Sequence, residues 1–573
     1  MTDISAHVPT SNLGWNTYGM GLDAVGRDGA PEPIAVPDMA PDQMLVRVDA
    51  VGLCFSDVKL IRLGGDHPKL YGRDLSVEPT RLGHEASVTV IAVGDELADT
   101  YSPGERLAIQ PDIHVDGVST AYGYTIPGGL IQYHLIGSEV LEGDEGAYVI
   151  PVTDELGYAS AALSEPWACV EAAYTQRRRL DPLDGGTRWV IADPVNDTAY
   201  DFGGSLSAAG SIVVTGASES MQAQITAAAG DVAVNFEDEI APADVAAFGA
   251  RHTGQTGFDD IIMLAPTSAV LVTEVAKLIA FRGTMNLVGT EPLDGDPDID
   301  FGRLHYHYTA YVGTDSPAIE TAYGEDRNRA DLRPGGVAAF VGAAGPMGQM
   351  HIQRSIEMAD GPDTLVCIDP DKDRMAVLVS TLQPLADAKG KTMVIVDPTA
   401  DDARSVIDGL TDGRGADDVV VSVPVAPVMA DAGRLMATDG MLVFFAGIAN
   451  GTFGPLDMSQ VYLSNAQFTG TSGSSVADQA SVLAKAMEGS LSPSLNLAAI
   501  GGIEAGRDGI QAVMEGRFAG KVLIFPQVTG VPLTGLGELA DVVPDVAAEL
   551  GPNGEWTDAA ERVLHANHGV AAP

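Results

Sequence analysis

Three side chains of the kinds that bind zinc stand in distinctive sequence settings. Cys54 lies in GLCFSDVKL, His84 in RLGHEASV and Glu165 in ALSEPWACVEAAY. A thiolate, an imidazole and a carboxylate together suit Zn2+, and three protein ligands leave a fourth position for water or substrate. We therefore predict a catalytic metal site.

Polar neighbours of these residues would support such a site. Glu85, beside His84, would act behind the ligands or exchange onto the metal. Asp57 would orient a ligating imidazole, and Ser56 would pass the substrate proton onward. We predict catalytic roles for Ser56, Asp57 and Glu85.

The chain has only three cysteines, too few for a disulfide framework, so each is a packing residue or a ligand. Cys169 lies one helical turn after Glu165 and would compete as a ligand, but its Ala-rich helix favours core packing.

A second motif has the form of a dinucleotide-binding loop. GGVAAFVGAAGPMGQMHIQRSIEM predicts an apolar strand, a Gly-rich turn and a helix. Gly345 would admit a pyrophosphate and Gly348 would allow close helix packing, although Ala343 replaces the usual first glycine. The predicted cofactor loop consists of Gly342, Ala343, Gly345, Pro346, Met347 and Gly348.

The next apolar run, TLVCIDPDKDR, indicates which nucleotide binds. Asp369 at its end would accept hydrogen bonds from the ribose 2′-hydroxyl of NAD and repel the 2′-phosphate of NADP. Arg374 would stack on adenine or pair with Asp369, or else be a solvated helix-start arginine. We predict NAD in preference to NADP.

Taken in order, G-x-C-x-S-D, G-H-E, G-E-R-L and S-E-P resemble the zinc-containing medium-chain alcohol and polyol dehydrogenases. GLCFSDVKL, SEPWACVEAAY and GPMGQMHIQR resemble most closely the L-sorbose-1-phosphate reductase branch. The resemblance implies that Cys54, His84 and Glu165 hold catalytic zinc. It also implies that Ser56 relays the alcohol proton, while Lys59 departs from a frequent relay histidine and leaves the outer relay open. Many members carry four close cysteines for structural zinc; residues 104–137 have none, so we expect one zinc.

The sequence changes in character along the chain. Up to about residue 182, short apolar runs between Gly, Pro and Asp turns predict a mostly β domain, whereas strands alternating with Ala-rich helices follow. The segment FDDIIMLAP is similar in sequence to ADDVVVSVP, and FRGTMNLVG is similar to TDGMLVFFAG. These matches indicate a duplicated unit. The predicted domains are a GroES-like catalytic domain (1–182), a degenerate Rossmann-like repeat (183–330), an NAD-binding Rossmann domain (331–475), a return to the catalytic domain (476–530) and a C-terminal extension (531–573).

The first copy has lost its phosphate-binding features. DPVNDTAYDF stands where the second copy has GAAGPMGQMH, and Thr215 ends its second strand where the second copy offers Asp369. We predict that this copy binds no dinucleotide and is a structural or docking domain. His305 and His307, in RLHYHYTAY, would pack across strands or, alternatively, reach the substrate.

These features predict a zinc-dependent oxidoreductase that transfers hydride between NAD(H) and a sugar alcohol or ketose. The branch resemblance implies a phosphorylated substrate, and a basic stretch would either meet that phosphate or be a solvated loop. The stretch consists of Lys59, Arg62, Lys69, Arg73 and Arg81. A dehydrogenase of non-phosphorylated polyols or secondary alcohols is the alternative, and a non-catalytic binding protein is the third hypothesis.

Charge and hydropathy exclude other classes. With 32 basic and 79 acidic residues the formal charge is -47, which disfavours nucleic acid and anionic membranes as partners. The N-terminal segment MTDISAHVPTSNLGWN lacks a basic region followed by an apolar stretch, and no apolar run is long enough for a bilayer. We expect a cytoplasmic homo-oligomer with a small-molecule substrate.

Overall fold

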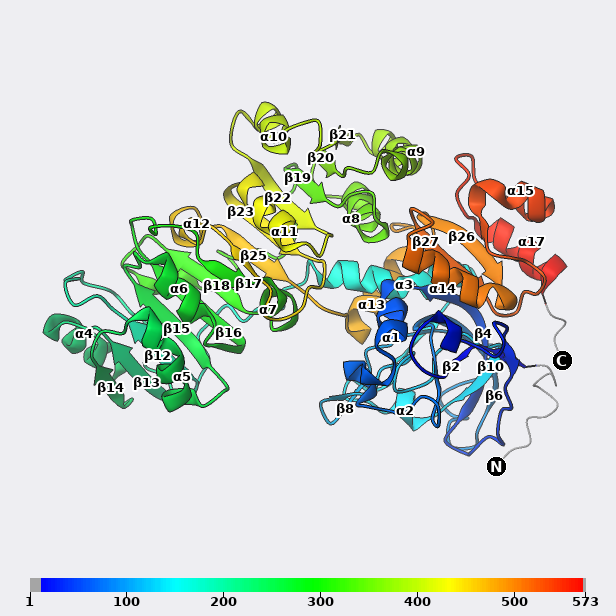
Figure 1. Cartoon of the computed structure of the whole chain (residues 1–573), viewed down its shortest axis with the longest axis horizontal. Coiled ribbons are helices and arrows are strands. Elements are labelled where there is room, and N and C mark those ends of the chain that lie inside the picture. Colours follow the sequence, from blue (N-terminus) through cyan, green and yellow to red (C-terminus); the bar gives the residue numbers. More distant parts are fainter. Residues whose placement is uncertain (1–11, 570–573) are drawn as a thin grey trace. The chain divides into compact units, whose positions relative to one another are not determined.

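The computed structural model describes residues 12–569 and divides the chain into two compact units (Figure 1). The first unit comprises Met1–Ala172, Ala376–Leu385 and Gly473–Pro573, and the second comprises Ala173–Met375 and Ala386–Ser472. Parts of the predicted first and last domains, and most of the N-terminal segment discussed above, lie outside the described residues. Within residues 12–569, none of the helices combines the length and apolar character needed to cross a membrane.

An eight-stranded, mostly antiparallel sheet forms the first unit, in the order β11-β7-β6-β4-β27-β26-β28 with β10 also on β4. Its strands are β4 (Met44–Leu53), β6 (Glu85–Val93), β7 (Arg106–Ile109), β10 (Tyr133–Ile136), β11 (Val149–Val152), β26 (Leu497–Gly502), β27 (Lys521–Phe525) and β28 (Thr534–Gly535). β4, nearly all of it buried, pairs with β6 on one side and β27 on the other. Two distant parts of the sequence therefore build one sheet.

Helices cover this sheet and carry part of the candidate site. They include α1 (Phe55–Leu63), α2 (Ser138–Leu141), α3 (Tyr158–Ala172), α13 (Val476–Met487), α14 (Gly506–Glu515), α15 (Leu539–Val542), α16 (Pro544–Ala547) and α17 (Asp558–His568). Small side chains let α3 lie close to the sheet, and nearly all its residues are buried. At α17, the Thr557 side chain accepts a hydrogen bond from Ala560 N, and Gly569 follows the last helical residue.

The C-terminal helix α17 docks on the start of α3. Glu561 is buried, and its carboxylate accepts hydrogen bonds from Tyr158 N at 2.5 Å and Ala159 N at 2.8 Å. These are N–H groups of the first turn of α3, which have no partner within their own helix. Burial nevertheless raises the pKa of Glu561 to about 7. The extension thus caps the helix that carries Glu165.

This raised pKa predicts a pH-dependent stability. Since the folded state favours protonated Glu561, wild-type protein should lose stability relative to Glu561→Gln as the pH rises from about 4.5 to about 7. We expect the Tm of the variant minus that of wild type to grow by roughly 2–5 °C between pH 5 and pH 8. Thermal scans at several pH values measure the difference, and a pH-independent difference would contradict it.

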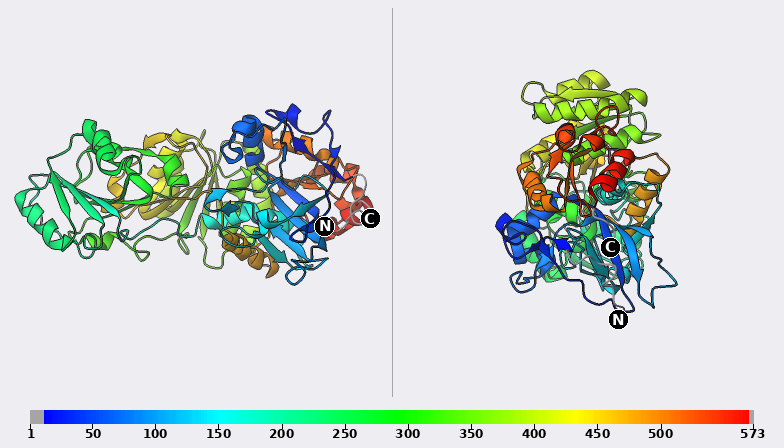
Figure 2. Two further views of the ribbon diagram at one scale, coloured as in Figure 1. Left: turned by 90° about the horizontal axis from the view of Figure 1, so that it is seen from below. Right: turned by 90° about the vertical axis from the view of Figure 1, so that its right-hand side faces the viewer.

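Two six-stranded parallel sheets make up most of the second unit, and they lie side by side in Figure 1 and in the left view of Figure 2. The first, in the order β14-β13-β12-β15-β16-β18, contains β12 (Thr187–Ile191), β13 (Ser211–Thr215), β14 (Val234–Glu237), β15 (Phe258–Leu264), β16 (Ile279–Val288) and β18 (Ala310–Thr314). The second, in the order β21-β20-β19-β22-β23-β25, contains β19 (Val337–Val341), β20 (Thr364–Ile368), β21 (Thr392–Val396), β22 (Ala416–Val421), β23 (Met436–Phe444) and β25 (Gln467–Gly470). Both have the Rossmann strand order, so the chain combines a GroES-like domain with two Rossmann-like units.

An ion-pair network repeats in the two copies. Arg179 Nη1 lies 2.6 Å from Asp260 Oδ1, and Arg329 pairs in the same way with Asp418. The backbone N–H four residues after each arginine donates to the same carboxylate, at 2.9 Å in the first copy and 2.7 Å in the second. These aspartates belong to the repeated FDD and ADD segments. The duplication therefore extends to individual buried contacts.

The copies differ at the first strand-to-helix connection. In the second copy, β19 is followed by α8 (Pro346–Glu357). In the first copy, residues 192–210, all of them described, link β12 to β13 without forming a helix. The first copy has therefore lost the helix N-terminus that would face a phosphate, as well as its glycines.

Candidate active site

Strand pairing assembles the candidate metal group. Cys54 follows β4 and directly precedes α1, while His84 directly precedes β6, the neighbour of β4. Possible ligand atoms of Cys54, His84 and Glu85 all lie within 4.8 Å of one another. His84 and Glu85 are buried, and Cys54 is half-buried. The donor set of thiolate, imidazole and carboxylate fits a zinc ion.

Asp57 lies in position to orient this group. Its carboxylate accepts hydrogen bonds from Cys54 N at 2.9 Å and Gly83 N at 3.1 Å, and lies 3.3 Å from His84 Nδ1. Burial by itself lowers the pKa of His84, but the Asp57 carboxylate raises it well above its usual value. Because Nδ1 faces Asp57, Nε2 is the nitrogen left for a metal.

Lys521 is a member of the site that the sequence did not reveal. Its buried Nζ lies 2.5 Å from Glu85 Oε1 and donates to Leu53 O at 3.2 Å. Glu85 Oε2 is buried without a hydrogen-bond partner, which leaves an acceptor for a cation. A Cβ on Gly52 would lie 2.0 Å from that oxygen, so only glycine fits beside it. The one available signal was a lysine opening the apolar run KVLIF.

Glu165 lies outside the closest group of three ligand atoms. It projects from α3, and burial raises its pKa to about 7, against the attraction of His84 and with the repulsion of Glu85. The Sγ of Cys169 lies 3.9 Å from Glu165 Oε1, and burial raises the pKa of Cys169 well above its usual value. Burial thus disfavours the thiolate of Cys169, which is the form that binds a metal. Glu165 stays our predicted third ligand, with Glu85 as the alternative.

The predicted proton relay begins in the first turn of α1. Ser56 is half-buried, with its Oγ 3.8 Å from Cys54 Sγ. Lys59, which stands where a relay histidine is frequent in the similar family, is exposed one turn further along α1. The structure thus offers Ser56 as the hydroxyl next to the candidate metal group.

Most of the basic stretch already has partners. The contacts are Lys69 Nζ to Asp112 Oδ1 (2.6 Å), Arg73 Nη1 to Glu78 Oε1 (3.7 Å) and Arg81 Nε to Gly128 O (3.2 Å). Lys59 and Arg62 are exposed on α1, with the guanidinium of Arg62 5.3 Å from the Phe55 ring centroid. A phosphate would therefore find fewer available cations than the sequence indicated.

The glycine loop of the second copy has the geometry of an anion cradle. β19 ends at Val341, Gly342 adopts a φ of 82°, and Gly345 caps α8. A Cβ on Gly348 would lie 2.2 Å from Gly342 O, so this glycine is needed for packing, whereas a Cβ on Gly345 would meet nothing closer than 3.7 Å. The space at Gly345 is thus open to a ligand. Pro346 opens the helix, where its missing N–H costs nothing.

The other predicted nucleotide-binding residues lie around this loop. Ala343 is buried and Met347 is half-buried within it. Asp369, which follows β20, accepts hydrogen bonds from Ala344 N at 3.1 Å and Asp371 N at 2.9 Å. Half-buried Arg374 lies in the first turn of α9 (Lys372–Ala388). Asp369 is thereby tied to the loop, as a ribose acceptor would be.

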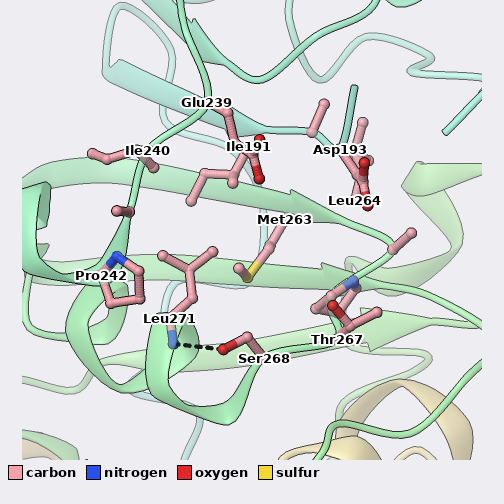
Figure 3. Close-up of a pocket in the computed structure, with 14 residues that line it drawn as sticks. Ile191, Asp193, Glu239, Ile240, Pro242, Met263, Leu264, Thr267, Ser268 and Leu271 are labelled. Atoms are coloured by element: carbon pink, nitrogen blue, oxygen red, sulfur yellow. Dashed lines mark hydrogen bonds between the residues drawn. The ribbon is translucent and has the colours of Figure 1, made fainter. Parts of the chain in front are cut away.

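At the carboxyl edge of the first copy lies a pocket of about 470 Å3 (Figure 3). Ile191, Ile240 and Met263 contribute apolar surface, and Asp193 and Glu239 add carboxylates. Two negative charges and the missing helix oppose phosphate binding at this edge.

Comparison with known proteins places this geometry in a family. Residues 40–141 match the alcohol dehydrogenase GroES-like domain. The L-sorbose 1-phosphate reductase of Klebsiella pneumoniae is 28% identical, over 50% of this chain and 73% of the relative. These matches support the medium-chain alcohol and polyol dehydrogenase superfamily. This dehydrogenase is thus an oxidoreductase that acts on CH–OH groups.

Two further similarities span nearly the whole dehydrogenase chain. The mannitol-1-phosphate 5-dehydrogenase of Aliivibrio fischeri is 23% identical and covers 92% of this chain and 93% of its own length. An alcohol dehydrogenase structure from Thermotoga maritima superposes with a TM-score of 0.50 at 12% identity, covering 90% of this chain and 99% of that one. The structural likeness shows the fold.

The two cysteines near the site should behave differently when replaced. Cys54→Ser should weaken zinc binding by more than about a hundredfold, because serine does not supply a thiolate. Cys169→Ser is the matched control and should retain zinc, since Cys169 lies outside the group of Cys54, His84 and Glu85 and burial disfavours its thiolate. Metal analysis after dialysis against a weak chelator measures both. Zinc loss in Cys169→Ser with retention in Cys54→Ser would reverse the assignment.

Proposed function

We propose that this chain is a zinc-dependent dehydrogenase that transfers hydride between NAD(H) and a sugar alcohol or ketose. The group of Cys54, His84 and Glu85 carries the proposal, because it joins zinc-type ligands to an unpartnered carboxylate oxygen. We assign Cys54, His84 and Glu165 as ligands of one catalytic zinc, with no structural zinc.

The protein's own residues would prepare this site for alcohol oxidation. Zinc, when bound, would lower the pKa of an alcohol and polarise a carbonyl. Asp57 fixes the His84 imidazole, and Lys521 holds Glu85 in place, so both site residues keep their orientation. Ser56 would carry the alcohol proton away from the reacting carbon.

NAD is the proposed hydride carrier, bound at the second copy of the Rossmann unit. The open space at Gly345 and the N-terminus of α8 suit a pyrophosphate, and Asp369 suits a ribose hydroxyl. We propose domain limits of 331–475 for this unit and 183–330 for the copy that binds no dinucleotide.

The substrate is proposed to be a polyol or ketose phosphate. The names of the Aliivibrio and Klebsiella relatives support this choice, and the first of them matches along nearly the whole chain. A non-phosphorylated polyol or secondary alcohol is the second candidate, favoured by the ion pairs that already engage Lys69 and Arg73.

A substrate panel distinguishes these two candidates. Wild-type protein with zinc is assayed for NADH formation on sugar-alcohol phosphates and on their parent polyols, with Cys54→Ser as the inactive control. We expect kcat/KM to be about tenfold or more higher for a phosphate, as charge-assisted hydrogen bonds would give. A higher value for the parent polyol would favour the second candidate, and a zinc-loaded protein inactive on all of them would overturn the proposed function.

Cofactor choice provides a separate prediction. Asp369→Ala should reduce the preference for NAD over NADP by about tenfold, because it removes a ribose acceptor and a charge that repels the 2′-phosphate. Asp371→Ala, two residues away at an exposed position, is the matched control and should retain the preference. Titrations of NADH and NADPH, followed by nicotinamide fluorescence, measure the ratio. Tighter binding of NADPH by wild type would refute this role of Asp369.

A further inference from the structure

The two Rossmann-like copies contact each other through corresponding elements. In the first copy, α7 (Phe301–Tyr306) packs on β25 and β23 of the second. In the second, α12 (Ser459–Leu463) packs on β18 and β16 of the first. Exchanging the copies therefore reproduces the same set of contacts. Such a reciprocal surface is the kind found between the subunits of a two-fold symmetric dimer.

Glycines at equivalent positions permit this close approach. A Cβ on Gly313 of β18 would lie 2.8 Å from Tyr462 Cβ in α12. A Cβ on Gly470 of β25 would lie 2.7 Å from Leu304 O in α7. Each edge strand thus has a glycine against which the other copy's helix rests. The two glycines lie in the matched segments HYTAYVGTDS and NAQFTGTSGS.

A short antiparallel ribbon strengthens the contact. β17 (Asp298–Asp300) pairs with β24 (Phe453–Pro455), so that Asp298 lies opposite Pro455. Phe301 and Phe444, one from each copy, stack at a ring-centroid distance of 5.1 Å. One continuous apolar core spans both copies. The contact therefore has the character of a domain core, as permanent interfaces do.

Helix α7 also reaches the candidate nucleotide site. The sequence assigned His305 and His307 to a strand, but His305 lies in α7 and His307 directly follows it. His305 is buried, and its Nδ1 donates to Phe444 O at 3.1 Å. A Cβ on Gly447 would lie 2.7 Å from Tyr306 Oη and 3.2 Å from His305 Nε2. β23 ends at Phe444, at the carboxyl edge where dinucleotides bind.

We propose that the first copy is the built-in partner of the second. It covers the face formed by β23, β25 and α12, which is thereby closed to a second chain, and its α7 braces one wall of the nucleotide site. This role explains why the first copy keeps an intact sheet and core although it lacks the glycine loop that would bind a phosphate. The role of α7 rests on the proposed function, whereas the pairing of the copies does not. His305 is a positioning residue that acts through the Phe444–Gly447 segment.

Cysteine cross-linking in the full-length chain tests the pairing. Asp298 and Pro455 are both exposed and face each other across the antiparallel ribbon, a geometry that accepts a disulfide. After mild oxidation, Asp298→Cys/Pro455→Cys should form that link within one chain and keep the denatured mass of 59.4 kDa. Asp298→Cys alone controls for bonds to native cysteines. Linked dimers, or no link at all, would overturn the pairing.

NADH binding tests the bracing role of α7. His305→Ala should weaken NADH binding by about tenfold, the effect of one lost buried hydrogen bond, and should leave zinc content unchanged. His305→Gln should recover much of this loss, because its amide can still donate to Phe444 O. His252→Ala, at the ion pair with Glu237 in the first copy, is the matched control. Unchanged affinity in a folded His305→Ala protein would overturn this role. If wild type itself bound no NADH, the proposed function would fail while the cross-linking result would still stand.

Discussion

The burial of several carboxyl groups in one place is the constraint on which the catalytic unit depends. Asp57, Glu85 and Glu165 are buried there, beside half-buried Asp112. The charge of His84 acts on Asp57, Asp112 and Glu165, and the charge of Glu85 acts on Glu165. Buried charges are tolerated only when they are paired. Lys521 pairs with Glu85 and Lys69 with Asp112, whereas burial raises the pKa of Glu165 to about 7. A divalent cation would complete this balance, which is why the unit is suited to zinc.

The stability of the second unit depends on a different requirement, which is that its sheet edges and apolar faces are covered. Each copy repeats an arginine–aspartate pair near the start of an inner strand, β15 in the first and β22 in the second, so the duplication preserved this contact. Only the connection after β12 was rebuilt without a helix. A sheet can lose a ligand site in this way and remain stable, because its core strands and its neighbour still bury their apolar faces. Structure and binding were therefore separable in this unit.

The sequence predicted what depends on local pattern. Cys54 and His84 flank apolar runs, and the pairing of those strands brings the two side chains together. The strand–turn–helix of the glycine loop was equally visible. Lys521 was not, because it stands 436 residues from Glu85 and a lysine before an apolar run has no distinctive local pattern. Nor was α7 predicted, since the alternating aromatics of RLHYHYTAY imitate a strand, and tertiary packing overrode that period. The sequence also indicated that the first copy lacks the glycines of the phosphate-binding loop. It did not indicate that the connection between β12 and β13 lacks a helix.

The pairing of β4 with β27 has a consequence for the order of events during synthesis. The ribosome makes Cys54, His84 and Glu85 early, but Lys521 and the strand that seals the sheet emerge only after the whole of the second unit. Domains fold as they are completed. The two Rossmann copies can therefore fold while the catalytic sheet still lacks its central neighbour and its lysine. Until then Glu85 lacks its counter-ion, so the candidate metal group stays incomplete in the nascent chain.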